Sequence, residues 1–213
     1  MRLLCAQHSQ EEDWGFLLID VQNAFNEEDR TAMIWDVRYE CSRGAGFTFN
    51  CYCHWATLVV RKMEEGSGHF LHSKEDVTQG DPLYMIEYGI GILPLIREIW
   101  DANPCITQPM YADDAGVGEK FGRILAHLQD LQARGPPQGY SPELTKSILV
   151  VDLRNMEKAE DFFCGMGIKV VKGSCYLGFF FGNREAEDNW LMEKVQGWKK
   201  SVKTLSGIAR NHL

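Results

Sequence analysis

The sequence predicts a mixed α+β fold in one globular unit, and three observations support this. Apolar runs of strand length, such as residues 16–19 and 176–181, alternate with segments that have helical periodicity. The clearest helical spacing covers residues 120–134 and ends at a Gly-Pro-Pro turn. No internal repeat, low-complexity tract or clear linker divides the 213 residues, which are enough to bury a sizeable core.

The first half of the chain places an acidic residue at the end of a predicted strand. The apolar run 16–19 stops at Asp20, so a carboxylate is expected where the strand ends. The next predicted elements are a helix at 24–36, a glycine-containing loop at 43–50 and a hairpin formed by 55–60 and 69–71. A loop at 77–83 then leads into a helix that reaches Trp100, with Pro94 expected to kink or break it.

The second half places two more acids at a predicted hairpin tip. Residues 106–111 and 115–117 are expected to be short strands joined through Asp113 and Asp114. After the helix at 120–134 come a strand at 147–151, a helix at 156–166, a hairpin around 170–171 and 176–181, and an amphipathic helix from Asn189 onward. Two glycines follow Asp114, at 116 and 118, and are expected to weaken that strand.

Composition indicates an ordinary intracellular protein, with the compartment, cytoplasmic or nuclear, left open. No apolar run approaches the roughly 20 residues that span a bilayer, so we expect no membrane partner, and no secretory signal is evident at the N-terminus. Seven scattered cysteines do not suggest a disulfide framework, and reduced thiols are expected. The Cys-Tyr-Cys-His segment at 51–54 has no second pair at a spacing that would complete a zinc site.

The net charge of −8 argues against a nucleic-acid partner, since proteins that bind phosphates usually present a basic surface. Two features soften this argument. The segment 193–213 is locally basic, and some of the acids could hold divalent cations rather than repel phosphates.

The three aspartates fit the chemistry of nucleotidyl transfer. That reaction uses two divalent ions, roughly 3.5–4 Å apart, to activate a hydroxyl and stabilise the leaving pyrophosphate. Magnesium prefers oxygen ligands, and Asp20, Asp113 and Asp114 supply them at strand ends. Each feature alone has a simpler interpretation, as a turn or a helix cap. Their order along the chain, with Gln-Gly-Asp-Pro-Leu at 79–83 between them, makes coincidence improbable.

In these motifs the chain resembles the reverse transcriptases of non-LTR retrotransposons, over residues 16 to 213. Five segments carry the resemblance: LIDVQNAFN at 18–26, QGDPL at 79–83, YADD at 111–114, GYSPELTKS at 139–147 and YLG at 176–178. It implies a polymerase palm at 1–188, the start of a thumb or connection helix at 189–213, and no fingers region. A fragment with weak or no activity alone is expected, since the fingers would hold the incoming triphosphate.

The resemblance also assigns roles to residues. It implies Mg²⁺ as the metal, with Mn²⁺ possible, held by Asp20, the Val21 carbonyl, Asp113 and Asp114, with Lys146 protonating the leaving group. The other implied roles are nucleotide and template binding by Phe25, Gln79, Gly80 and Tyr111, and a primer grip formed by Tyr176, Leu177 and Gly178. Phe25 and Tyr176 also fit ordinary core positions, and Lys146 fits a solvated strand end.

The implied partners are a primed RNA template, with a DNA or RNA primer, deoxynucleoside triphosphates, and a separate fingers-bearing chain. Asp76 stands where the family usually has glycine and adds negative charge near the phosphate-binding pocket. This substitution and the acidic charge favour an alternative: an inactive retroelement relic that keeps the palm fold and at most binds nucleic acid. A further alternative is another two-metal phosphotransferase built on a similar palm.

Overall fold

The computed structural model describes residues 2–8, 10–22, 24–61, 68–73, 82–111 and 114–212. A mixed five-stranded sheet in the order β4-β5-β1-β6-β7 forms its centre. Its strands are β1 Trp14–Ile19, β4 Met110–Tyr111, β5 Asp114–Lys120, β6 Ile148–Val151 and β7 Lys169–Val171. All neighbouring strands are antiparallel except β6 and β7, which run parallel. The α+β palm-like fold expected from the sequence is thereby confirmed.

Helices and two hairpins surround this sheet. The helices are α1 Arg2–Gln7, α2 Ala24–Glu27, α3 Arg30–Glu40, α4 Ala45–Tyr52, α5 Tyr84–Gly91, α6 Leu93–Ala102, α7 Phe121–Arg134, α8 Met156–Phe162 and α9 Arg184–His212. The hairpins are β2 Ala56–Arg61 with β3 Gly68–Ser73, and β8 Gly173–Tyr176 with β9 Phe179–Gly182. Short 3-10 turns occupy Pro136–Gln138 and Leu153–Asn155.

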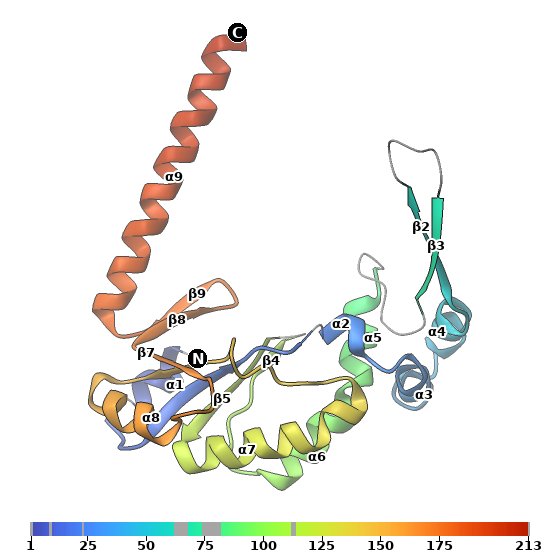
Figure 1. Cartoon of the computed structure of the whole chain (residues 1–213), viewed down its shortest axis with the longest axis horizontal. Coiled ribbons are helices and arrows are strands. Elements are labelled where there is room, and N and C mark those ends of the chain that lie inside the picture. The colour runs from blue at the N-terminus through green and yellow to red at the C-terminus, as the bar shows by residue number, and fades with distance from the viewer. Residues whose placement is uncertain are drawn as a thin grey trace.

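The sheet is covered on both faces. Leu17, Ile19 and Leu149 pack on one face into the main core, which includes apolar residues of α7. Phe16 and Leu18 face the other way and pack with Tyr176 and others in a second core cluster. Because β1 is buried on both sides, its sequence is a continuous apolar run rather than an alternating one. Figure 1 shows α9 projecting away from the body beyond β8 and β9.

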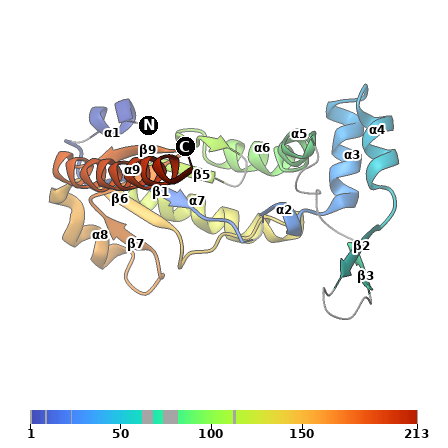
Figure 2. The same cartoon turned by 90° about the horizontal axis from the view of Figure 1, so that it is seen from above.

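The helices and hairpin between β1 and α5 form a lobe whose buried residues Met33, Val37 and Tyr52 belong to the main core. Figures 1 and 2 show α3, α4 and the β2–β3 hairpin at the end of the molecule away from α1 and α9. The expected helix at 24–36 is in fact α2 followed by α3, because Asp29 interrupts it and caps α3, accepting the Ala32 N–H at 2.9 Å. The loop expected at 43–50 is wrong, since α4 begins at Ala45.

Other sequence expectations hold with local corrections. The break at Pro94 is confirmed, since α6 begins at Leu93 directly after α5 ends. The expected hairpin joining 170–171 to 176–181 is wrong, because β7 pairs parallel with β6 and the hairpin is β8–β9. None of the seven cysteines, all of which lie among the described residues, forms a disulfide. Among the described residues, no helix combines the length and apolar character that crossing a membrane requires.

Packing against a neighbouring ring explains why glycine occupies positions 116 and 118, which the sequence did not reveal. A Cβ atom at Gly116 would lie 2.7 Å from the ring of Phe16, which is fully buried on the neighbouring strand. A Cβ at Gly118 would lie 2.9 Å from the same ring. The two glycines therefore make room for Phe16, and β5 pairs with β1 along its length. The weak strand expected there is a tightly packed one.

Gly116→Ala is expected to destabilise the protein by about 1–3 kcal/mol, because the added methyl group overpacks Phe16. Gly122→Ala is the matched control: Gly122 lies in α7 with no atom near its missing Cβ, so a gain of about 0.5–1 kcal/mol is expected. Urea unfolding of both variants measures the difference. Equal stability of the two variants would contradict the packing described for β5.

Candidate functional site

Asp114, Asp20 and Lys146 form a row at one end of the sheet, at the start of β5, just after β1 and just before β6. The register pairs Ile19 with Ala115, so the next position outward places Asp20 opposite Asp114. On the other side of β1, the pairing with β6 ends at Leu18 and Ile148, and Lys146 lies in the turn that precedes β6. The Lys146 Nζ atom lies 3.7 Å from Asp20 Oδ2. Asp20 thus lies at the same end of the sheet as Asp114 and Lys146, which follow it by 94 and 126 positions in the sequence.

The two aspartates project from the same face of the sheet. Side chains alternate along a strand, so Asp20 follows Leu18 onto the face that carries the second core cluster. Position 116 also faces Phe16 on that side, and Asp114 lies two residues before it. Both aspartates are exposed. The β8–β9 hairpin covers the same face, since Tyr176 and Phe181 belong to this cluster.

The backbone of Asp20 is fixed by the segment that precedes β6. Its N–H donates to the Ser147 hydroxyl at 3.2 Å, and its carbonyl accepts the Glu143 N–H at 2.8 Å. The buried Ser147 hydroxyl donates in turn to the Glu143 carbonyl at 2.9 Å. Val21 is buried and forms an isolated bridge with Pro142. Asp20 therefore stands on a backbone that is held on both sides of the residue.

Negative charge dominates the surroundings of Lys146. The Thr145 hydroxyl donates to the Glu143 carboxylate at 2.6 Å, and this bond, with the nearby lysine, holds the pKa of Glu143 below its usual value. Lys146 thus has Asp20 and an ionised Glu143 as neighbours. Lys146 lies beside Asp20, and its expected role near a triphosphate stays a prediction.

Tyr176 links the β8–β9 hairpin to the predicted catalytic hairpin. Its hydroxyl donates to the Asp114 carbonyl at 2.9 Å. Burial, aided by the negative charge of Asp114, raises the pKa of Tyr176 to about 12, so the hydroxyl keeps its proton. Tyr176 is nearly buried, and it therefore fills the core position that the sequence left as an alternative to a primer contact.

The turn of the same hairpin is exposed and has unusual backbone angles. Leu177 and Gly178 have φ values of 49° and 80°. A positive φ is uncommon for leucine and costs energy there. Leu177 is nevertheless solvent-exposed, as is Phe179 beside it. The expected primer grip is thus a strained apolar tip anchored through Tyr176.

The remaining predicted site residues are only partly placed. Tyr111 in β4 pairs with Asp114 and is exposed. Phe25 lies in α2, and its side chain is outside the described part of the structure. Asp113, Gln79 and Gly80 also lie outside it. The sequence analysis gave no role to Ser147 and Glu143, whose hydrogen bonds fix the backbone of Asp20. The largely polar run at 143–147 was the only sign of them in the sequence.

The donors at this end of the sheet suit a divalent cation. Exposed carboxylates on a rigid strand end are ligands that Mg²⁺ prefers, and substrate phosphates and water complete such sites. Within the described ranges, which exclude Asp113, no three His, Cys, Asp or Glu side chains form a metal-binding group. Asp20 and Asp114 therefore fit as two ligands of a site that would need further donors.

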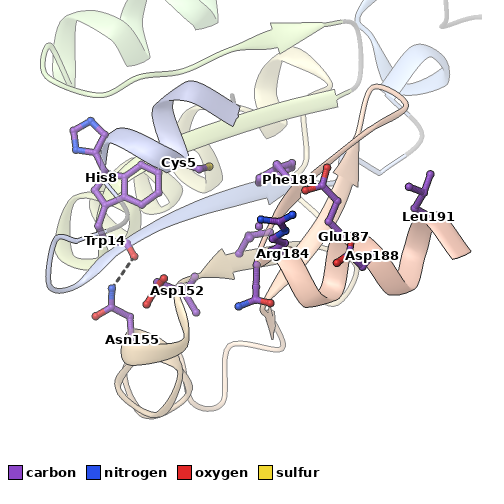
Figure 3. A pocket seen from close by; sticks show the side chains of 14 residues that line it. Cys5, His8, Trp14, Asp152, Asn155, Phe181, Arg184, Glu187, Asp188 and Leu191 are labelled. Carbon is purple, nitrogen blue, oxygen red and sulfur yellow. Dashed lines mark hydrogen bonds between the residues drawn. The ribbon is translucent and has the colours of Figure 1, made fainter.

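A cavity of about 500 Å³ lies elsewhere, at the opposite end of β1 from Asp20. Figure 3 shows it between α1, the end of β6 and the start of α9. The His8 ring stacks on Trp14 at 5.1 Å, and Asn155 donates to the Trp14 carbonyl at 3.4 Å. It contains none of the site residues expected from the sequence.

No family model matches the sequence, and no curated protein matches it either. Solved structures of similar fold include telomerases from Candida. The apo telomerase of Candida tropicalis truncated from its C-terminal domain aligns with a TM-score of 0.56 and 12% identity, over 84% of this chain and 36% of that one. The telomerase of Candida albicans in complex with the TWJ fragment of telomeric RNA gives 0.60 and 10%, over 85% and 32%. The apo telomerase of Candida tropicalis gives 0.58 and 11%, over 84% and 33%.

These similarities concern the fold. Telomerase is a member of the reverse transcriptase family, and the chain has a reverse-transcriptase-like palm fold. The chain spans about a third of the length of these telomerases.

Proposed function

We propose that this chain is the palm portion of an RNA-directed DNA polymerase of the non-LTR retrotransposon type. The observation that carries the proposal is the row of Asp114, Asp20 and Lys146 at one end of the sheet. Residues from three separate motifs meet there. They supply the groups that nucleotidyl transfer uses: carboxylates that can hold metal ions, and a lysine beside them. The reverse-transcriptase-like fold and the RNA present in one telomerase structure support the same substrate class.

In this proposal Asp20, Asp113 and Asp114 hold two Mg²⁺ ions, or Mn²⁺ ions, assisted by the Val21 carbonyl. When bound, the ions activate the primer 3′-hydroxyl and stabilise the pyrophosphate. The primer oxygen bonds to the α-phosphorus of a deoxynucleoside triphosphate while the bond to pyrophosphate breaks. Lys146 supplies a proton to that leaving group. Ser147 and Glu143 keep Asp20 in place through its backbone.

The other motif residues position the substrates. Phe25 closes the space for a ribose 2′-hydroxyl, and Gln79, Gly80 and Tyr111 line the nucleotide and template pocket. The exposed tip at Leu177 and Gly178 holds the primer end, with Tyr176 anchoring it to the Asp114 backbone. The start of the thumb at 189–213 lies along the duplex, where its lysines meet phosphates. A separate fingers-bearing chain completes the triphosphate site.

The test is incorporation of labelled deoxynucleotides on a primed RNA template with magnesium. The chain is compared with Asp113→Asn, alone and with a fingers-bearing chain added. Magnesium-dependent signal that is lost in the variant supports the proposal. A folded chain that incorporates nothing under either condition contradicts it.

A second candidate is a palm-fold protein that binds nucleic acid without catalysis. The net charge of −8 favours the absence of catalysis, because a strongly acidic chain attracts anionic triphosphates and nucleic acid poorly. Duplex binding that is independent of magnesium and nucleotide, together with absent incorporation, would identify this candidate.

A further inference from the structure

A groove between α3 and α4 presents aromatic rings to solvent. We call it the α3–α4 groove; it has a volume of about 750 Å³, and Trp35, Phe49 and Trp55 are among its lining residues. It lies in the lobe at the end of the molecule away from α9 (Figures 1 and 2). The row of Asp114, Asp20 and Lys146 contributes no residue to it. The groove is therefore distinct from the proposed polymerase site.

Three of the rings that line this groove lie outside the core, whereas a fourth, Tyr52, is buried in it. Trp35, Phe49 and Trp55 are 51%, 55% and 60% exposed. Trp35 also stacks on Tyr39, with ring centroids 6.3 Å apart and planes inclined by 22°. Large rings left in water contribute little to the stability of the fold, whereas their faces are suited to stacking with planar ligands.

The charges of the groove are positive. The Arg38 guanidinium lies over the Trp35 ring at 5.4 Å, and Arg38 has no ion-pair partner among the described residues. Arg30 lies deeper and donates to the carbonyls of His54 and Ser73, which joins α3 to both ends of the β2–β3 hairpin. No aspartate or glutamate lines the groove, although the chain has 30 acidic residues and 22 basic ones. The groove is thus complementary in charge to a polyanion.

We propose that the α3–α4 groove binds single-stranded nucleic acid. Unpaired bases pack against the exposed parts of the Trp35 and Phe49 rings, while Arg38, which lies over the Trp35 ring, contacts a neighbouring phosphate. A duplex is a poor occupant, because its bases are already stacked on one another and present only edges. The site needs neither metal nor triphosphate, so it goes beyond the proposed polymerase function and does not depend on it.

The test is fluorescence anisotropy of a short labelled oligouridine with the full chain, without magnesium or nucleotides. Trp35→Ala is expected to weaken binding by about tenfold, since stacking of one base on an aromatic side chain is lost. Trp35→Phe keeps a ring and is expected to retain most of the affinity. Arg38→Gln is expected to reduce the slope of log affinity against log salt by about 0.7, the value for one phosphate contact on a single strand.

Matched controls separate the groove from general effects. Trp100 lies on α6 outside the groove and is 52% exposed, so Trp100→Ala removes an equally exposed ring. Arg123→Gln removes an exposed arginine from α7. Both are expected to leave affinity and salt slope unchanged. Equal affinities of Trp35→Ala and the unaltered chain for the oligouridine would overturn the proposal and indicate a protein-docking groove. The proposal would also be overturned if a blunt duplex displaced the oligouridine as well as an unlabelled single strand does.

Discussion

Asp20→Asn is expected to lower magnesium-dependent incorporation of deoxynucleotides by about a thousand-fold. The amide keeps the size of the side chain but loses the negative charge that a divalent ion requires. Loss of one metal ligand removes several kcal/mol of transition-state stabilisation, and each 1.36 kcal/mol corresponds to about tenfold in rate. The fold should persist, because the contacts that fix this residue to Ser147 and Glu143 use its backbone.

The matched control is Asp161→Asn, which removes an exposed carboxylate from α8. It is expected to keep full incorporation. Primer extension by both variants on the same RNA template gives the comparison, with circular dichroism as a check of folding. A similar rate for Asp20→Asn and Asp161→Asn would remove Asp20 from the proposed metal site.

The second large effect is a loss of stability as pH rises, caused by Glu28. Its side chain is 2% exposed, and neither carboxylate oxygen has a hydrogen-bond partner among the described residues. It lies against Gly91 of α5, where an added Cβ would come within 2.0 Å of the Glu28 Oε1 atom. Burial, followed by the charges of Glu87, Asp36 and Asp29, raises the pKa of Glu28 from 4.5 to about 8.

The direction follows from the raised pKa. Below pH 4.5 both the folded and unfolded chains carry the proton, so Glu28 causes no pH-dependent loss of stability there. Between pH 4.5 and about 8 only the folded chain retains it, so each pH unit lowers the free energy of unfolding by about 1.4 kcal/mol. The total loss across this window is on the order of a few kcal/mol. Above pH 8 the folded state holds a buried, unpaired charge.

Glu28→Gln is expected to abolish this loss, since the neutral amide needs no proton. Urea unfolding near pH 5 and near pH 8 compares the variant with the unaltered chain and with Glu160→Gln, which changes an exposed residue of α8. Glu28→Gln should be markedly more stable than both at the higher pH. An unchanged pH dependence in this variant would show that Glu28 is not the responsible group.

Elements with strong local signals could be predicted from the sequence. Helix α7 follows from the spacing of its apolar residues, and its observed range, Phe121–Arg134, is within one residue of the prediction. Strand β1 follows from its apolar run, which the structure extends to Trp14. The locations of Asp20 at a strand end and Asp114 at the start of β5 were also predictable.

Elements that depend on distant contacts were missed. Helix α4 contains glycine and begins after an exposed turn, so its local sequence favours a loop. Tertiary contacts stabilise it instead, because Tyr52 is buried and the Thr48 hydroxyl donates to the buried Glu87 carboxylate at 2.8 Å. Strand β7 pairs parallel with β6 after a crossover connection through α8. Its three residues are too few for the sequence to indicate which strand it pairs with.

The candidate site could likewise be predicted only in part from the sequence. The motifs predicted its residues, but the approach of Asp20 to Asp114 depends on the register of β1 and β5, and its approach to Lys146 on the turn that precedes β6. Sequence alone could not show that Ser147 would hold the Asp20 backbone across the sheet, since this bond spans 127 positions. It also could not show that Gly116 and Gly118 accommodate the ring of Phe16.

The most direct test of the central claim is to locate the bound metal on the chain itself. Fe²⁺ replaces Mg²⁺ at oxygen-ligand sites and, with ascorbate and peroxide, produces hydroxyl radicals that cut the nearby backbone. Cleavage is predicted next to Asp20 and next to Asp114, suppressed by excess magnesium and absent in Asp20→Asn. Cleavage confined to other segments, or the same pattern in Asp20→Asn, would contradict the claim that this row of residues holds a catalytic metal.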